Sequence, residues 1–400
     1  MRKVLKFGGS SLADLDKMRN VAQKVRDRAL QGEELVVVVS AMGKTTNQLM
    51  AMIGEASQAP SKREVDVMLS TGEQVSIALL AMILQELGTP AISLTGFQAG
   101  ILTEGLHTKT KILDIDTTAV ERQLASGNVV VVAGFQGYNE AGDITTLGRG
   151  GSDTTAVALA AKLGCGCEIY TDVSGIYGVD PRLFPPARQL EEITWEEMKE
   201  MAFLGSKVME PRSVDIAQHF GVEIYVASAH ENITGTYIRK AGKSMEHRSI
   251  TGLSVLEHIM MVTLRNLPMD SDQVAEVFTR LAGEEINIDM ISQIPMADGT
   301  VSLSFTAPAL DRAAVEALLR DLLQTLPGVS MDIETGLIKV SVVGSGMRTQ
   351  SGVAARLFQI LSDHKIPFRQ VSTSEISISY TMAEKYKEPA VAAIASAFDL

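Results

Sequence analysis

The chain has 400 residues, of which 46% are hydrophobic and 21% charged, and its formal net charge is −12. This composition favours a globular protein of two or three domains, and the negative charge argues against nucleic acid or an anionic membrane surface as a partner. Two cysteines, Cys165 and Cys167, are too few for a disulfide framework or a four-ligand zinc site, so we expect reduced thiols.

The N-terminal segment enters a strand-like pattern at once, without an apolar run long enough for a signal peptide. Later apolar runs, such as 36–39 and 77–84, are shorter than the ~20 residues needed to cross a bilayer. We therefore expect a cytoplasmic protein in which these runs form core strands and a buried helix.

Residues 1–240 alternate short Val/Ile-rich runs with helical stretches. This alternation predicts an α/β domain with a mainly parallel sheet between layers of helices. Thr194 and Glu197 form a capping box that marks the start of one helix. Strands are expected at 4–7, 35–39, 129–133 and 223–226, and other helices at 14–30, 63–87 and 154–162.

A polar, glycine-bearing stretch at 241–249 is typical of a linker. Two segments with a similar order of strands and helices follow, which predicts two ferredoxin-like α+β modules. The second ends one strand short, and an orphan strand precedes the first. Because an unpaired sheet edge is costly, we expect the orphan strand to complete the second module. The predicted modules are thus 258–335 and, for the second, 250–257 plus 336–400.

The modules can be divided into elements by the same patterns. In the first module, strands are expected at 260–265, 286–293, 301–306 and 330–334, and helices at 272–283 and 311–323. In the second, strands are expected at 251–257, 338–343, 368–372 and 376–380, with a helix at 352–364 and another running into Leu400.

Three glycine-rich stretches follow strands or precede a helix in the α/β domain. Open α/β sheets bind ligands beyond the carboxyl ends of their strands, where bare backbone N–H groups favour anions. Any one stretch is equally consistent with a tight turn. Together, with Lys6, Arg149 and Asp153 embedded in them, they favour a site for phosphate and carboxylate groups. The stretches are 6–11 (KFGGSS), 40–43 (SAMG) and 148–153 (GRGGSD).

The motifs KFGGSS, VVSAMG, GEQVS, TTLGRGGSDTTA, YTDVSGIYGVDPR and GSKV resemble those of the aspartokinase family. The resemblance covers the whole chain, including two C-terminal ACT-type modules. It implies an amino-acid-kinase fold, MgATP and L-aspartate as substrates, and ADP and 4-phospho-L-aspartate as products. Mg²⁺ is expected to arrive with ATP, and no metal site built by the protein alone is predicted.

The chemistry that this implies needs no general base, because a carboxylate is already ionised at neutral pH. Catalysis then depends on positioning two anions and neutralising their charge. By the resemblance, Lys6 and Lys207 neutralise the transferring phosphoryl group and Asp153 orients Lys6. From the residues alone, Asp153 is also consistent with a helix N-cap.

A site specific for aspartate should match its ammonium and its two carboxylates with partners of opposite charge. By the resemblance, Arg149 clamps the α-carboxylate and Glu73 meets the α-ammonium. From the sequence alone, Glu73 is about as consistent with a plain acid at a helix N-terminus. The other residues expected to line the pocket are Ser40, Thr46, Phe135 and Ser152.

The resemblance also assigns a nucleotide site and a sensor. Without it, 180–182 would be interpreted only as a turn. The sensor is expected to bind an aspartate-derived amino acid, with L-lysine ahead of threonine and meso-diaminopimelate, where ACT modules meet in a homodimer. The nucleotide residues are Gly8, Gly9, Ser10, Thr171, Asp172, Tyr177, Asp180 and Arg182, and the sensor residues are Asn287, Asp289 and Met290.

Three alternatives stay open at this point. Related kinases of the same fold act on acetylglutamate, glutamate, carbamate or nucleoside monophosphates, although GRGGSD and the paired modules favour aspartate. A non-catalytic amino-acid-binding regulator is opposed by the intact Lys6, Asp153 and Lys207. The modules could also serve dimerisation only.

Some family members make the C-terminal half separately, and Met245 or Met260 could start such a fragment, with ordinary linker or core methionines as the alternative.

Overall fold

The computed structural model describes residues 1–231, 233–240, 242 and 249–400. Most of the predicted linker, 241–249, therefore lies outside the described residues. The chain divides into two compact units. The N-terminal unit comprises 1–177, 189–203 and 207–245, and the C-terminal unit comprises 178–188, 204–206 and 246–400.

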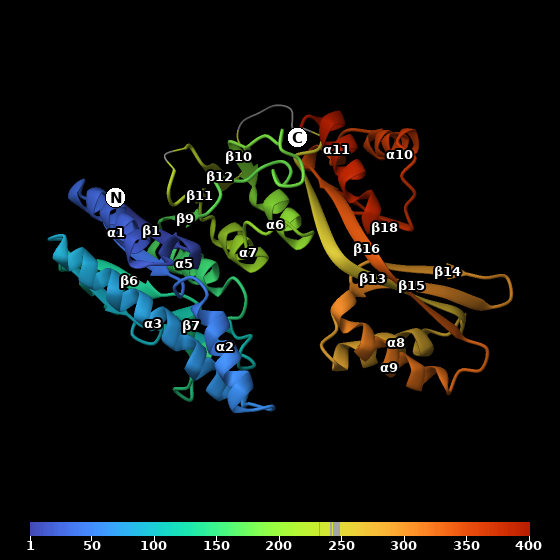
Figure 1. Ribbon diagram of the computed structural model, residues 1–400, viewed down its shortest axis with the longest axis horizontal. Helices are drawn as coiled ribbons and strands as arrows, with labels where there is room; N and C mark the ends of the chain where they lie inside the picture. The colour runs from blue at the N-terminus through green and yellow to red at the C-terminus, as the bar shows by residue number, and fades with distance from the viewer. Residues whose placement is uncertain (232, 241, 243–248) are drawn as a thin grey trace. The chain divides into compact units, whose positions relative to one another are not determined.

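An eight-stranded sheet forms the centre of the N-terminal unit (Figure 1). Its strand order is β10-β12-β11-β9-β1-β2-β6-β3, and all neighbours are parallel except β11 and β12. The central strands are buried on both faces, as expected for continuous Val/Ile runs. The strands are β1 (Arg2–Phe7), β2 (Glu34–Val39), β3 (Ala91–Leu94), β6 (Val129–Ala133), β9 (Gly166–Thr171), β10 (Glu192–Thr194), β11 (Ile224–Ser228) and β12 (Thr236–Arg239).

Helices cover both faces of this sheet. The apolar sides of α1 and α3 pack on the face that carries Leu5 and Phe7. α5 packs on the other face, which carries Lys6, because successive side chains of a strand alternate. The helices are α1 (Leu15–Leu30), α2 (Thr45–Ala56), α3 (Lys62–Glu86), α4 (Thr118–Ala125), α5 (Gly151–Leu163), α6 (Trp195–Phe203) and α7 (Pro211–Phe220), and a 3-10 turn, η1, spans Gly9–Leu12.

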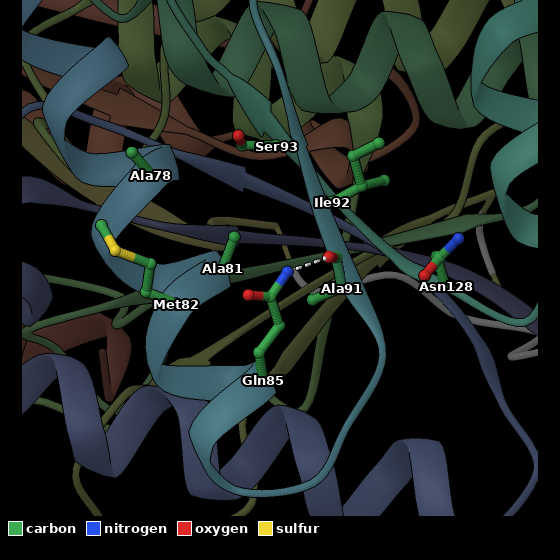
Figure 2. A pocket seen from close by; sticks show the side chains of 8 residues that line it. All are labelled: Ala78, Ala81, Met82, Gln85, Ala91, Ile92, Ser93 and Asn128. Atoms are coloured by element: carbon green, nitrogen blue, oxygen red, sulfur yellow. Dashed lines mark hydrogen bonds between the residues drawn. The ribbon is translucent and has the colours of Figure 1, made fainter.

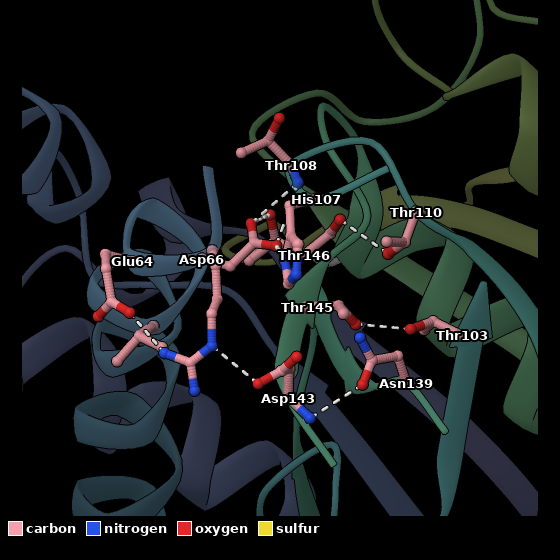
Figure 3. A network of polar contacts seen from close by, with 12 residues as sticks. Glu64, Asp66, Thr103, His107, Thr108, Thr110, Asn139, Asp143, Thr145 and Thr146 are labelled. Carbon is pink, nitrogen blue, oxygen red and sulfur yellow. Dashed lines mark hydrogen bonds and ion pairs between the residues drawn. The ribbon is translucent and has the colours of Figure 1, made fainter. Parts of the chain in front are cut away.

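A second, four-stranded sheet was not predicted. Its order is β5-β4-β7-β8, and its strands are β4 (Ile101–Glu104), β5 (Lys111–Ile115), β7 (Gln136–Tyr138) and β8 (Ile144–Thr146). These strands have only three to five residues and mix polar with apolar side chains, so they lack the long apolar runs that marked the main sheet. The small sheet lies near α3 and carries the polar contacts that Figure 3 shows.

Three predictions concern the N-termini of helices. The capping box is confirmed, because Glu197 N donates to Thr194 Oγ1 at 3.1 Å and Thr194 N donates to Glu197 Oε2 at 3.4 Å. The N-cap interpretation of Asp153 is wrong, since α5 starts at Gly151 with Gly150 as its N-cap. Glu73 is not an N-terminal acid either, because it lies in the middle of α3.

α3 is long and apolar enough to cross a membrane by length and composition alone. More than half of its apolar stretch is buried inside the unit, and core leucines and Glu73 lie on the buried side. This agrees with the predicted buried helix. The two cysteines are free, and burial raises the pKa of both thiols.

The described part of the C-terminal unit contains one antiparallel six-stranded sheet, β14-β15-β13-β16-β18-β17, and four α-helices (Figure 1). Two hydrophobic cores, one for each half of the sheet, pack beneath the helices. The strands are β13 (Gly252–Pro268), β14 (Ile291–Pro295), β15 (Thr300–Pro308), β16 (Ser330–Val343), β17 (Gln370–Thr373) and β18 (Ser377–Ala383), and the helices are α8 (Ser271–Gly283), α9 (Arg312–Leu323), α10 (Val353–Asp363) and α11 (Lys387–Phe398).

The orphan strand is the first half of β13. Residues 252–256 pair with 339–343 of β16, and 261–265 pair with 330–334. The expectation of separate strands was therefore wrong, because β13 and β16 each run unbroken through both halves of the sheet. No glycine or proline interrupts 253–267, and the change of register near His258 bends β13 without ending it.

The other difference concerns residues 286–290, which were expected to begin a strand. β14 starts only at Ile291. Asp289 N donates to Thr306 O at 3.0 Å, so this segment runs beside the end of β15 without joining the ladder. Glu285, at φ 55°, turns the chain just before it.

Candidate active site

The glycine stretches meet at the carboxyl ends of β1 and β2. Gly43 N donates to Gly9 O at 2.9 Å, and a Cβ on Gly9 would lie 2.6 Å from Ala41 O. The third stretch joins them, because Ser40 Oγ donates to Ser152 Oγ at 2.9 Å. The first two stretches approach so closely that only glycine fits at position 9.

Lys6 and Asp153 form an ion pair in this region. Lys6 is the last residue but one of β1, and its Nζ lies 2.7 Å from Asp153 Oδ1 in the first turn of α5. The two side chains are only 10% and 13% exposed. A Cβ on Gly8 would lie 3.5 Å from Lys6 Nζ, so the ammonium sits beside the first glycine stretch. This ammonium, together with the N-terminus of α5, suits a bound anion.

Glu73 is buried in the wall formed by α3. Its exposed fraction is 3%, and its Oε1 accepts a hydrogen bond from Ala41 N at 3.0 Å. Its Oε2 is buried and has no hydrogen-bond partner among the described residues. Burial raises the pKa of Glu73 to about 7, and the hydrogen bond from Ala41 opposes that rise. A carboxylate in this state is suited to receive a cation.

Phe135 lies against the third stretch. Its backbone is left-handed, at φ 69°, and its N donates to Thr155 Oγ1 at 3.1 Å. A Cβ on Gly151 would lie 2.9 Å from the phenyl ring. Arg149 is exposed within the stretch, and Thr46 is half-buried in the first turn of α2.

Lys207 is exposed in the connection between α6 and α7. No described contact joins it to Lys6 or Asp153. Three residues later, the side chain of Glu210 lies 2.6 Å from where a Cβ on Gly150 would be. Burial raises the pKa of Glu210, and the nearby Asp153 raises it further, against the effect of Arg212. The Lys207 segment therefore leads toward the third stretch.

The residues assigned to nucleotide fall into two groups. Gly8 N donates to Tyr170 O at 3.3 Å, which places the first stretch beside the end of β9, where Thr171 Oγ1 donates to Asp172 Oδ1 at 3.0 Å. Tyr177 is half-buried and forms an isolated bridge with Gln189. Asp180 and Arg182 belong instead to the segment 178–188 of the C-terminal unit.

The turn expected at 180–182 is confirmed. Arg182 N donates to Asp180 Oδ1 at 2.9 Å, and Arg182 Nη2 lies 2.6 Å from Asp180 Oδ2. Around this turn, Val179, Leu183 and Phe184 pack on the core of the second half of the C-terminal sheet.

The predicted sensor residues lie in the C-terminal unit. Asn287 is exposed, and Met290 is buried, with its N donating to Thr306 Oγ1 at 3.0 Å. The carboxylate of Asp289 forms an ion pair with Lys339, whose side chain is 1% exposed within β16. Asp289 thus already binds one ammonium of the chain.

Two other kinds of site can be compared with the one formed by the glycine stretches: a metal cluster and the pocket in Figure 2. The described residues contain no group of three His, Cys, Asp or Glu side chains arranged for a metal ion. The pocket, of about 350 Å³, lies between α3 and the edge strand β3, and no charged residue lines it. Its lining residues are Ala78, Ala81, Met82, Gln85, Ala91, Ile92, Ser93 and Asn128.

The sequence analysis did not identify the buried polar residues that hold the small sheet and the loop beside the site. The clearest is Asp66, which is fully buried in α3 and accepts hydrogen bonds from the small sheet and a loop (Figure 3). Asp66 and Glu73 are seven residues apart, so they share one helix face. Two acids at this spacing in a largely apolar helix were a usable signal, because buried acids need partners.

Comparison with known proteins gives consistent matches. Residues 1–228 match the amino acid kinase family, and residues 340–398 match an ACT domain. The chain is 47% identical to aspartokinase from Geobacillus stearothermophilus over 398 residues, covering 99% of this chain and 97% of the relative. It is 44% identical to aspartokinase 2 from Bacillus subtilis (strain 168), with the same coverage.

Solved structures give the same picture. E. coli aspartokinase III in complex with aspartate and ADP has a TM-score of 0.83 at 26% identity, covering 100% of both chains. The structure of that enzyme in complex with lysine and aspartate has a TM-score of 0.79 at 26% identity, covering 99% of each chain.

Proposed function

The chain belongs to the aspartokinases of the amino acid kinase family, and on that premise we propose that its three glycine stretches bind MgATP and L-aspartate for phosphoryl transfer. The enzyme transfers the γ-phosphoryl group of ATP to the side-chain carboxylate of aspartate. The ion pair of Lys6 with Asp153 beside Gly8 is the observation that carries the assignment of the site. An ADP-release assay with a panel of acceptor amino acids tests it, and turnover confined to aspartate is expected.

Lys6 supplies the positive charge for the transferring phosphoryl group, and Asp153 holds it in place. Because the attacking carboxylate is already ionised, no residue needs to remove a proton. Lys207 is the second cation. The nearby Glu210–Gly150 contact supports its approach to the third stretch.

Aspartate binds with its α-ammonium at Glu73 and its α-carboxylate at Arg149. The buried Oε2 of Glu73, which lacks a described partner, supports this orientation of aspartate. Ser40, Ser152, Phe135 and Thr46 line the rest of the pocket. The nucleotide binds at Gly8, Gly9, Ser10, Thr171, Asp172 and Tyr177 of the N-terminal unit.

Mg²⁺ enters bound to the phosphates of ATP. The ion would be held chiefly by phosphate oxygens, as is common for magnesium with nucleotides. It supplies charge neutralisation between the two substrate anions.

The pKa of Glu73 predicts that aspartate binding depends on pH. Below about pH 7 the carboxyl group of the free enzyme is protonated and cannot pair with the ammonium, so kcat/KM for aspartate should fall about tenfold per pH unit. Steady-state rates between pH 5.5 and 8.5, with saturating MgATP, measure this. Glu73→Gln should have a low, flat profile over the same range. A flat profile for the unmodified enzyme would remove Glu73 from the ammonium site.

The C-terminal unit is regulatory. We assign 258–335 and 250–257 plus 336–400 as two ACT domains after a catalytic domain at 1–240 and a linker at 241–249, in a cytoplasmic homodimer joined through ACT domains. The unbroken β13 and β16 couple both domains through one sheet. A fragment starting at Met260 would lack the pairing of 252–256, and Met245 lies outside the described residues.

L-Lysine is the proposed effector, binding near Asn287, Asp289 and Met290. Aspartokinase III of E. coli has been solved with lysine, which supports this choice. A lysine side chain would compete with Lys339 for Asp289. Titration with lysine should inhibit turnover, and Asp289→Ala should weaken that inhibition about tenfold or more through the loss of a charged partner. Threonine and meso-diaminopimelate are titrated in parallel, and inhibition by none of the three would leave the unit a dimerisation element.

A further inference from the structure

Asp66 is a buried carboxylate with three different donors (Figure 3). Thr146 Oγ1 donates to Asp66 Oδ1 at 2.5 Å, and His107 Nδ1 lies 2.6 Å from Asp66 Oδ2. The backbone N of Thr108 lies 3.1 Å from both carboxylate oxygens. One side chain of α3 thus fastens the loop 105–110, between β4 and β5, to the last residue of β8.

Thr108 is held in an unfavourable conformation. Its φ of 72° is left-handed, which is strained for a β-branched residue and persists where surrounding contacts impose it. The bond from its N–H to Asp66 is such a contact. Next to it, Thr110 N and Thr110 Oγ1 both donate to Thr146 O, at 3.1 and 2.9 Å, so the loop is fixed at a second point.

The fastened loop touches the third glycine stretch. A Cβ on Gly148 would lie 3.2 Å from Thr108 O, and Gly148 itself has φ 78°. Gly148 follows Thr146 by two residues and immediately precedes Arg149. The path from Asp66 to Arg149 is therefore short, and it runs both through space, by Thr108, and along the chain, by Thr146.

We propose that Asp66 is a positioning residue for aspartate specificity: by fixing Thr108 and Thr146 it sets the place from which Arg149 reaches the substrate carboxylate. This rests on the proposed role of Arg149. Asp66 is fully buried, which places its carboxylate out of reach of a substrate. It acts through the loop, and its effect should fall on aspartate and spare ATP, because Lys6 and Gly8 are held by other contacts.

Asp66→Asn tests this chemistry closely. An amide offers one acceptor oxygen and two N–H donors, so it cannot accept from Thr108, Thr146 and His107 as the carboxylate does. We expect the KM for aspartate to rise about tenfold or more, with the KM for ATP changed less than about twofold, as for the loss of one or two hydrogen bonds to a charged group.

A double-mutant cycle separates positioning from a general loss of structure. If Asp66 acts through Arg149, Asp66→Asn in an Arg149→Ala background should raise the KM for aspartate no further than Arg149→Ala alone. Multiplicative effects of the two changes would overturn the proposal. If Arg149→Ala leaves the KM for aspartate unchanged, the proposed role of Arg149 and this inference both fail, whereas a normal Asp66→Asn variant beside an impaired Arg149→Ala variant overturns the inference alone.

Neighbouring threonines supply a milder variant and its control, in case Asp66→Asn does not fold. Thr146→Val removes one donor to Asp66. Thr145→Val removes the adjacent hydroxyl of β8, which faces the other way and lies 2.6 Å from Thr103 Oγ1. Both should melt at similar temperatures. Only Thr146→Val should raise the KM for aspartate, and equal KM values in the two variants would contradict the proposal.

Discussion

Lys6→Met is expected to lower turnover by about 10²–10³-fold or more, the loss seen when a preorganised group that stabilises transition-state charge is removed. The ammonium lies beside Gly8 and is held by Asp153, so methionine keeps the side-chain volume but removes the charge. Folding should change little, because the strand stays paired with β2 and β9 through backbone bonds. Turnover at saturating substrates, measured beside thermal melting, checks both parts.

Lys3→Met is the matched control. Lys3 lies in the same strand, three residues earlier, and its Nζ is 3.9 Å from Glu168. It lies on the opposite face of β1 from Lys6, so turnover should stay normal. Normal turnover in Lys6→Met, or equal loss in both variants, would show that the catalytic centre has been assigned wrongly.

Most of the central sheet was predictable because its strands consist almost entirely of apolar residues. Val36–Val39 of β2 and all of β6 are buried on both faces, and such runs admit few other interpretations. The small sheet was missed for the converse reason. Its strand β8 is Ile-Thr-Thr, whose burial depends on hydrogen bonds to Asp66 and Thr103 that no local pattern reveals.

The candidate site was likewise predictable only in part. Glycine stretches after strands identified the region, since a close approach such as that of Gly9 to Ala41 O requires glycine. Partners distant in sequence were not predictable. The pairing of Asp289 with Lys339 joins the segment before β14 to the far half of β16, and it becomes visible only when β16 is seen to run through both halves of the sheet.

Arg149→Ala should raise the KM for aspartate most strongly of all the substrate-side changes. Losing a bidentate partner leaves a carboxylate unpaired and costs about 2–5 kcal/mol, which corresponds to roughly 30- to several-thousand-fold in affinity. Arg149 is exposed in its loop, so melting should be unaffected. Initial rates at varied aspartate and saturating MgATP measure the change, and the KM for ATP should move little.

Two further variants show whether geometry or charge is responsible. Arg149→Lys keeps the charge without the planar fork, so it should recover only part of the lost affinity. Arg63→Ala removes another surface guanidinium, one that pairs with Asp143 2.8 Å away, and should leave aspartate kinetics unchanged. Full recovery with lysine would reduce the role of Arg149 to a point charge. An effect of Arg149→Ala confined to the KM for ATP would move Arg149 to the nucleotide side and leave the α-carboxylate to another cation.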